Sequence, residues 1–335
     1  MSMMDAIKEQ ARCAPQRVVF PEGTDELMLR AAVQAAAEGY ARPLVVGEPE
    51  ALAGRCAELG LAADQLSVVS ASDTAYLEDV AARYAALPGT MLGRRALLRR
   101  MAADPLYLAL GMEAVGDADV TFAGVATSTG EVIMAGQQVI GLAEGVEAVS
   151  SVAFGEIPDF AGGEAGAIAF GDAAVVVDPS AEELAGIAIS CCDSTRDLMG
   201  WEPRCALLSF STCGSTVNAA SRKVAEAVRI AQERRPDLAI DGEFQLDTAL
   251  DPRIAARKVQ RASEVAGRAN VVVFPSLDAG NIAVKVLQGP ARTYVIGPFL
   301  QGFRKVVSDC SRGAGVDAIV GNIAVSCLRA ARLGA

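Results

Sequence analysis

The sequence predicts an α/β fold of two domains with mostly parallel sheets. Short apolar runs that lack strict alternation are typical of strands buried on both faces, and here they alternate with Ala-rich helical stretches. The chain also has 335 residues, about the length of two domains. A Gly-rich segment at 158–166 is the weakest point for a boundary, although it could equally be a surface loop.

Each expected element follows from its local pattern. A helix is expected over 25–38, because apolar residues recur there at helical spacing and the pattern stops at Gly39. Ser180 and Glu183 form a capping box that opens a helix through about Ser190, and a further helix is expected over 217–233. Apolar runs predict strands at 17–20, 43–46, 66–69, 120–124, 173–177, 205–210, 238–241, 270–274 and 294–296.

The composition excludes several classes of function. With 41 acidic against 30 basic residues the formal net charge is −11, which argues against general binding to nucleic acids or anionic membranes. No apolar run is long and uncharged enough to span a bilayer, and the first residues do not have the pattern of a signal peptide. The eight Cys include no CxxC pair, so reduced thiols in a cytoplasmic protein are expected.

The chain contains no histidine. This excludes Ser-His-Asp and Cys-His nucleophilic mechanisms and zinc sites with His ligands. Any general acid or base must therefore be a carboxylate, Tyr, Lys or Cys.

Ligands of open α/β sheets bind beyond the carboxyl ends of the strands, so the strand-to-helix junctions are the candidate sites. The segment 209–215 offers small hydroxyl residues and Gly to an anion at a helix start, or it simply caps that helix. Three carboxylates in 241–247 could bind a metal or act as acid and base. They could equally order the loop by capping helices and pairing with Arg253 or Lys258.

Two further junctions and one basic cluster carry candidate residues. The segment 274–281 places Asn281 at a turn before a helix that carries Lys285. The segment 308–317 contains Ser311 and Arg312, a hydroxyl beside a permanent charge that a phosphate or a developing oxyanion could use; the alternative is an N-cap with a surface Arg. Four arginines could form a solvated helix face or a steering patch for an anionic substrate. They are Arg94, Arg95, Arg99 and Arg100.

Taken in this order, the segments resemble the phosphate acetyltransferase/phosphate butyryltransferase family over nearly the whole chain. The stretches that carry the resemblance combine Gly, Pro, hydroxyl and acidic residues. They are 19–23 (VFPEG), 104–107 (DPLY), 124–129, 178–185 (DPSAEELA), 208–215 (LSFSTCGS), 241–247, 266–270, 274–285, 297–302 and 311–313 (SRG).

The resemblance implies the two-domain fold of isocitrate and isopropylmalate dehydrogenases. The first domain would be discontinuous, 1–145 plus 298–335, with a second α/β domain, 146–297, inserted into it and the active site in the cleft between the two. A homodimer is also implied. The implied reaction is acetyl-CoA plus phosphate giving acetyl phosphate plus CoA, by direct attack of phosphate on the thioester in a ternary complex. It needs no metal, no cofactor other than CoA as substrate and no covalent intermediate, and such an attack does not require a histidine.

The family pattern assigns roles to individual residues. Arg312 would bind phosphate or stabilise the oxyanion, and Ser311 would hydrogen-bond near the thioester sulfur. Asp317 would be the base for the CoA thiol, one position before the family's Asp, where this chain has Ala318. The implied substrate-binding residues are Ser128, Thr129, Ser209, Ser211, Thr212, Arg94, Arg95, Asn281 and Lys285.

Two family arginines are replaced by Leu87 and Met134, and Arg94 or Arg95 could substitute for the first of them. Met134 in place of a charge would favour a longer or different acyl-CoA, which is one alternative to acetyl-CoA. Another alternative is a catalytically degraded member that senses acyl-CoA or phosphate. An NADP-dependent dehydrogenase of similar fold is disfavoured, because no GxGxxG stands at a strand-to-helix junction.

Overall fold

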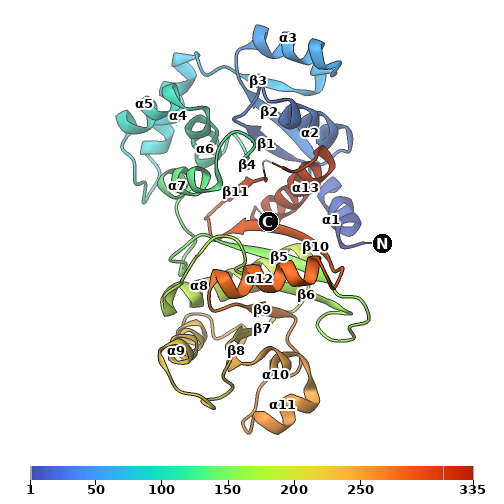
Figure 1. Ribbon diagram of the computed structural model, residues 1–335. Coiled ribbons are helices and arrows are strands. Elements are labelled where there is room, and N and C mark those ends of the chain that lie inside the picture. Colours follow the sequence, from blue (N-terminus) through green and yellow to red (C-terminus); the bar gives the residue numbers. More distant parts are fainter. Residues whose placement is uncertain (1, 312, 335) are drawn as a thin grey trace. The chain divides into compact units, whose positions relative to one another are not determined.

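A computed structural model describes residues 2–311 and 313–334, in two compact units each built around one sheet (Figure 1). Unit 1 comprises Met1–Ala143 and Phe303–Ala335, and unit 2 comprises Glu144–Gly302. The resemblance had placed boundaries near Gly145 and Gly297. The second of these positions lies inside strand β10 (Tyr294–Gln301), which pairs along its length with β5 (Ser150–Glu156) of unit 2.

Unit 1 contains a five-stranded, fully parallel sheet. Its order is β11 (Val306–Asp309), β4 (Val120–Ala123), β1 (Gln16–Phe20), β2 (Ala41–Val46) and β3 (Ser67–Val69). The four strands expected in this part of the chain are confirmed. Strand β11 was not expected, because its last two residues, Ser308 and Asp309, belong to the segment 308–317 that the sequence predicts to open the last helix.

Helices cover both faces of this sheet (Figure 1). On one face lie α1 (Met3–Arg12), α2 (Glu26–Ala37) and α13 (Val316–Leu333). On the other lie α4 (Thr74–Ala85), α5 (Arg94–Ala103), α6 (Pro105–Val115) and α7 (Thr129–Val139), and α3 (Pro49–Leu59) packs on β3. The helix expected over 25–38 is confirmed as α2, since the Asp25 side chain caps it by accepting the N–H of Met28.

Unit 2 contains a six-stranded mixed sheet. The pairs β10–β5 and β5–β6 are antiparallel and the remaining pairs are parallel, which confirms mostly parallel sheets for the chain. The order is β10, β5, β6 (Ala167–Gly171), β9 (Val271–Val273), β7 (Arg204–Leu208) and β8 (Ala239–Phe244). The Gly-rich segment 158–166 is the connection between the antiparallel strands β5 and β6.

The helices of unit 2 pack on opposite faces of its sheet. Helices α8 (Ala181–Met199) and α9 (Ala219–Arg234) pack together on one face, and the Ser180 capping box opens α8 as expected. Side chains of α10 (Leu246–Leu250) and α12 (Leu277–Gln288) join an apolar cluster on the other face that includes Phe170 and Phe244. Helix α11 (Pro252–Lys258) follows α10 directly.

The prediction of a strand over 173–177 is wrong. Strand β6 ends at Gly171, and the next residue, Asp172, turns its carboxylate back to accept the N–H groups of Ala174, Val175 and Val176 at 3.0, 3.3 and 2.7 Å. These amides are therefore bound to a side chain and not to a neighbouring strand. The apolar run ends at the surface, where Val177 is 70% exposed.

None of the helices in the described ranges combines the length and the apolar character that crossing a bilayer requires.

One acidic side chain lies in the core of unit 1. Glu113 of α6 is fully buried, and this burial raises the pKa of its carboxyl to about 8. Near pH 7 the group is therefore a neutral acid.

Replacing Glu113 with Gln tests this burial. In the folded protein Glu113 keeps its proton up to about pH 8. In the unfolded chain it loses the proton at the ordinary pKa of Glu, about 4.3. Wild-type stability relative to E113Q should thus be greatest at low pH, fall by about 1.4 kcal/mol per pH unit, and level off above about pH 8. Urea unfolding of both proteins across this range measures the difference. A difference that does not change with pH contradicts the prediction.

Candidate active site

Three neighbouring strands of unit 1 end at one edge of the sheet, and a carboxylate joins the loops that follow two of them. Glu22, just after β1, accepts the N–H groups of the four residues that follow β4. The four nitrogens, of Gly124, Val125, Ala126 and Thr127, lie 3.2, 2.9, 3.0 and 2.7 Å from its oxygens. Because a protein carboxylate binds these amides, the loop leading to Ser128 has a defined shape without a ligand.

The loop passes very close to the end of β11. Gly124 has a φ of +111°, and a Cβ there would lie 2.6 Å from the backbone nitrogen of Cys310. Only glycine fits this position without strain. The segments around 124 and 310 are therefore held against each other at the carboxyl edge of the sheet.

Ser128 and Thr129, the expected phosphate-binding residues, open α7. Ser128 is its N-cap: the hydroxyl accepts the N–H of Glu131 and donates to the Glu131 carboxylate at 2.6 Å. Thr129 donates its hydroxyl to the Asp309 carboxylate at 2.5 Å. Both hydroxyls thus lie at the start of a helix whose free N–H groups and dipole favour an anion.

Asp309 is the functional candidate that the sequence alone did not single out. It is the last residue of β11 and lies opposite Ala123 of β4. Burial raises the pKa of its carboxyl, and the hydrogen bond from Thr129 opposes this rise. An acidic residue at a strand end is a usable signal, but here it required β11 to be identified first.

The segment after β11 carries the three expected catalytic residues. Ser311 is exposed, and its hydroxyl accepts the N–H of Gly313 at 3.3 Å. Arg312 lies outside the described residues. Asp317 is exposed in the first turn of α13 and accepts a hydrogen bond from Gln34 of α2 at 3.3 Å. Ser311 and Thr129 thus follow the ends of paired strands, and the roles assigned to the three residues stay predictions.

Cys310 separates Asp309 from Ser311 and is buried. Burial, with the neighbouring carboxylates of Glu22, Asp309 and Asp25, raises the pKa of this thiol to about 12. The thiol therefore stays protonated and is a poor nucleophile at neutral pH.

The two expected arginines of α5 lie at the start of that helix. Arg94 forms an ion pair with Glu78 of α4 at 2.7 Å, with both side chains about half exposed. Arg95 is exposed. The Arg94–Glu78 pair matches the solvated helix face that was one of the two interpretations of this cluster.

In unit 2, the loop after β7 is bound to the end of β8. Ser211 is fully buried and donates its hydroxyl to Glu243 at 2.8 Å, and the same carboxylate accepts the N–H of Gly214. Thr212 is buried and accepts the N–H of Gln245 at 2.9 Å. Ser209 accepts the N–H of Ser211 at 3.2 Å. These hydroxyls order the loop, and their expected contacts with substrate stay predictions.

The carboxylates of 241–247 also have partners within unit 2. Asp241 is bound by Arg261 at 2.5 Å and by the Ser263 hydroxyl at 2.6 Å. Asp247 pairs with Lys258 at 2.9 Å, as the loop-ordering interpretation expected, while Arg253 pairs with Asp251 instead. Across 2–311 and 313–334, no group of three or more acidic or Cys side chains is placed to hold a metal ion.

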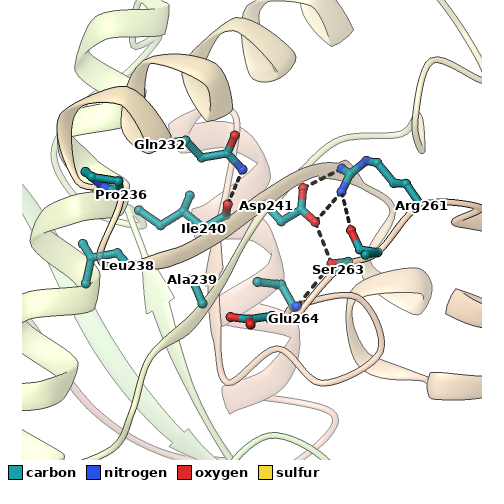
Figure 2. A pocket seen from close by; sticks show the side chains of 11 residues that line it. Gln232, Pro236, Leu238, Ala239, Ile240, Asp241, Arg261, Ser263 and Glu264 are labelled. Atoms are coloured by element: carbon teal, nitrogen blue, oxygen red, sulfur yellow. Dashed lines mark hydrogen bonds and ion pairs between the residues drawn. The ribbon is translucent and has the colours of Figure 1, made fainter.

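A pocket of about 360 Å³ lies beside β8. Figure 2 shows Arg261 in its lining, turned toward Asp241. The ion pair and the Ser263 hydroxyl occupy its polar side, so the charges there neutralise each other. Of the candidate residues named from the sequence, Asp241 lines it, whereas none of the catalytic or substrate-binding residues implied by the family resemblance does.

On α12, the Asn281 amide donates to the carbonyl oxygen of Ala173 at 3.1 Å, which ties the helix to the loop after β6. Lys285 is exposed and lies 3.4 Å from the Gln288 side-chain oxygen. Lys223 of α9 was not expected from the sequence. Its ammonium group contacts Asp178 at 2.7 Å and the carbonyl oxygen of Pro275 at 3.0 Å, joining the loops that follow β6 and β9.

The family model described as "Phosphate acetyl/butaryl transferase" matches residues 2–327. The chain belongs to this family. The phosphate acetyltransferase of Clostridium acetobutylicum is 37% identical in an alignment of 335 positions that covers 99% of each chain. A solved phosphotransacetylase from Streptococcus pyogenes has a TM-score of 0.87 and 31% identity, over 99% of this chain and 100% of its own. A putative 4-hydroxythreonine-4-phosphate dehydrogenase from Salmonella typhimurium, 14% identical with a TM-score of 0.53, shares the fold alone, in line with the expected dehydrogenase-like architecture.

Removing the Glu22 carboxylate should loosen the loop that leads to Ser128. In Glu22→Ala, the amides of 124–127 lose their acceptor and should exchange with deuterium at least about tenfold faster. Amide exchange followed by mass spectrometry measures this.

Glu48→Ala is the matched control, since Glu48 accepts hydrogen bonds from Ser70 and Ser72 elsewhere in unit 1. It should leave 124–127 unchanged. Equal exchange of that peptide in wild type and E22A would show that Glu22 does not order the loop.

Proposed function

We propose that this chain transfers the acetyl group of acetyl-CoA to inorganic phosphate, giving acetyl phosphate and free CoA. The observation that carries the proposal is the match to the phosphate acetyl/butaryl transferase family over residues 2–327. The absence of histidine agrees with it, because phosphate oxygen attacks a thioester carbonyl directly when it is well oriented. The protein then has to orient phosphate, stabilise negative charge and manage one proton.

The carboxyl edge of the unit 1 sheet is where we place phosphate. Ser128 and Thr129 supply hydroxyls at the positive end of α7, and Arg312 supplies the charge. Phosphate oxygen attacks the thioester carbon, the carbon–sulfur bond breaks, and the sulfur leaves as a thiolate that takes up a proton. Ser311 hydrogen-bonds near this sulfur, and Asp317 holds the proton that moves to or from it. No metal and no cofactor besides CoA takes part in the proposed reaction.

A cytoplasmic location belongs to this proposal. All eight cysteines are free, including the buried neighbours Cys191 and Cys192. Free thiols persist in reducing compartments.

A longer acyl chain is the second candidate substrate. Leu87 and Met134 are 38% and 52% exposed, so two apolar side chains reach solvent at positions where the family has arginines. Exposed apolar side chains favour contact with methylene groups, at about 0.8 kcal/mol per buried CH₂.

The decisive assay follows CoA release from acetyl-CoA with and without phosphate. Wild type should release CoA only when phosphate is present, and Arg312→Ala should lower kcat/KM by about 10²-fold or more, the cost of losing a donor to developing charge. Arg42→Ala, exposed at the amino end of β2, is the matched control and should keep wild-type activity.

Propionyl-CoA and butyryl-CoA in the same assay decide the chain length. A higher kcat/KM for either selects the longer substrate. If CoA binds but none of the three acyl-CoA substrates is turned over, the proposed enzymatic activity is contradicted and the chain is a binding protein.

We infer that two copies of the chain associate through α12. Its outer face carries Ile282 and Val286, one turn apart and 63% and 53% exposed, and Val177 accompanies them because its carbonyl oxygen accepts the N–H of Leu277. An exposed apolar stripe of this kind favours a partner, and the family resemblance suggests a second copy.

Sedimentation velocity tests the association. Wild type should sediment as a dimer, and a variant with Ile282→Glu and Val286→Glu should sediment as a monomer. Val68→Glu, at a 41% exposed position of β3, is the control and should remain dimeric. A wild-type monomer, or a double variant that stays dimeric, rules this surface out.

A further inference from the structure

The Thr129–Asp309 hydrogen bond links two segments that the proposed reaction uses. Thr129 is the first residue of α7, and Asp309 is the last residue of β11. Their side-chain oxygens are 2.5 Å apart although 180 positions separate them in the chain. Thr129 is exposed and Asp309 is half-buried.

The surroundings of Asp309 are acidic. Burial favours the neutral form of its carboxyl, as the raised pKa of this group indicates. Glu22 is occupied by four amides and Glu131 by Ser128, so neither shares a proton with Asp309. Among the described residues, Glu22, Asp25 and Asp309 surround the adjacent thiol of Cys310, while Glu131 lies in the first turn of α7 and Asp317 in the first turn of α13.

The protonation state of Asp309 decides what Thr129 can offer to a ligand. A threonine hydroxyl has one hydrogen to donate and two lone pairs to accept with. An ionised Asp309 only accepts, so the Thr129 hydrogen points toward it and only lone pairs face outward, where they repel phosphate oxygens. A protonated Asp309 donates its own hydrogen to Thr129, and the Thr129 hydrogen is then free for phosphate. Both arrangements keep the same short contact.

We propose that Asp309 is a positioning residue that sets the direction of the Thr129 hydroxyl hydrogen and thereby the affinity for phosphate. This inference rests on the proposed function only in that phosphate is the anion bound at the start of α7. Asp309 acts through Thr129 and does not itself touch the reacting atoms.

The test compares phosphate binding and phosphate KM in wild type and Asp309→Asn at a series of pH values across the whole range in which both proteins stay folded. The Asn side chain can always donate its amide hydrogen to Thr129. Wild-type Kd and KM for phosphate should therefore rise by about tenfold relative to D309N as Asp309 ionises, while kcat stays within about twofold. Ionisation of phosphate itself affects both proteins alike, so the ratio isolates Asp309.

Variants at Thr129 complete the test. Thr129→Val removes the hydroxyl and should raise the Kd for phosphate at every pH, and adding D309N to it should change nothing further. Thr129→Ser keeps the hydroxyl and should follow wild type. Thr129 is exposed at the start of α7, so the single variants T129V and T129S keep the inference testable even if D309N folds poorly.

The outcomes separate this inference from the proposed function. If phosphate binding, measured by calorimetry with inorganic phosphate alone, follows the expected pattern but acetyl-CoA is not turned over, the inference stands and the function fails. If turnover occurs but the Kd for phosphate has parallel pH profiles in wild type and D309N, the inference is wrong. It is also wrong if adding D309N to T129V still changes the Kd for phosphate.

Discussion

The contact on which the edge of unit 1 depends is the Glu22 carboxylate with its four amide donors. It fixes the loop after β4, and through Gly124 that loop lies against the end of β11. The arrangement also limits how an anion can be bound. Successive backbone N–H groups commonly cradle phosphate, but here a side chain of the protein already holds them. An anion at this edge would therefore be bound by hydroxyls, by the start of α7 and by charged side chains, and not by these four amides.

The acidic residues of this histidine-free chain fall into two sets. Some bind several amides and hydroxyls or pair with a cation, and others have fewer polar contacts. Asp172 and Glu243 bind loop amides and hydroxyls, and Asp241 and Asp247 neutralise cations within unit 2. Because their oxygens already have strong partners, these carboxylates are poorly placed to exchange protons with a substrate. Within residues 2–311 and 313–334, Asp309 accepts a hydrogen bond from the Thr129 hydroxyl and Asp317 accepts one from the Gln34 amide.

Local patterns predicted most of the fold. Apolar runs located most of the parallel strands but not β6 or the antiparallel β5, and capping residues located the starts of α2 and α8. They failed where a side chain overrode the pattern, as Asp172 does for 173–177, and where a strand was short, as β11 is. The site was predicted only in part. Ser128 and Ser311 belong to recognisable motifs, but the importance of Glu22 and Asp309 depends on contacts across 102 to 180 positions, which no local pattern contains.

The discontinuity of unit 1 has a consequence for the order in which the protein is made. Residues 144–302 form a continuous unit and are synthesised before β11 and α13. Unit 2 can therefore begin to fold while unit 1 still lacks an edge strand and a covering helix. In a nascent chain the open side of β4 stays unpaired until 306–309 arrive, and a cellular chaperone has that interval in which to shield it.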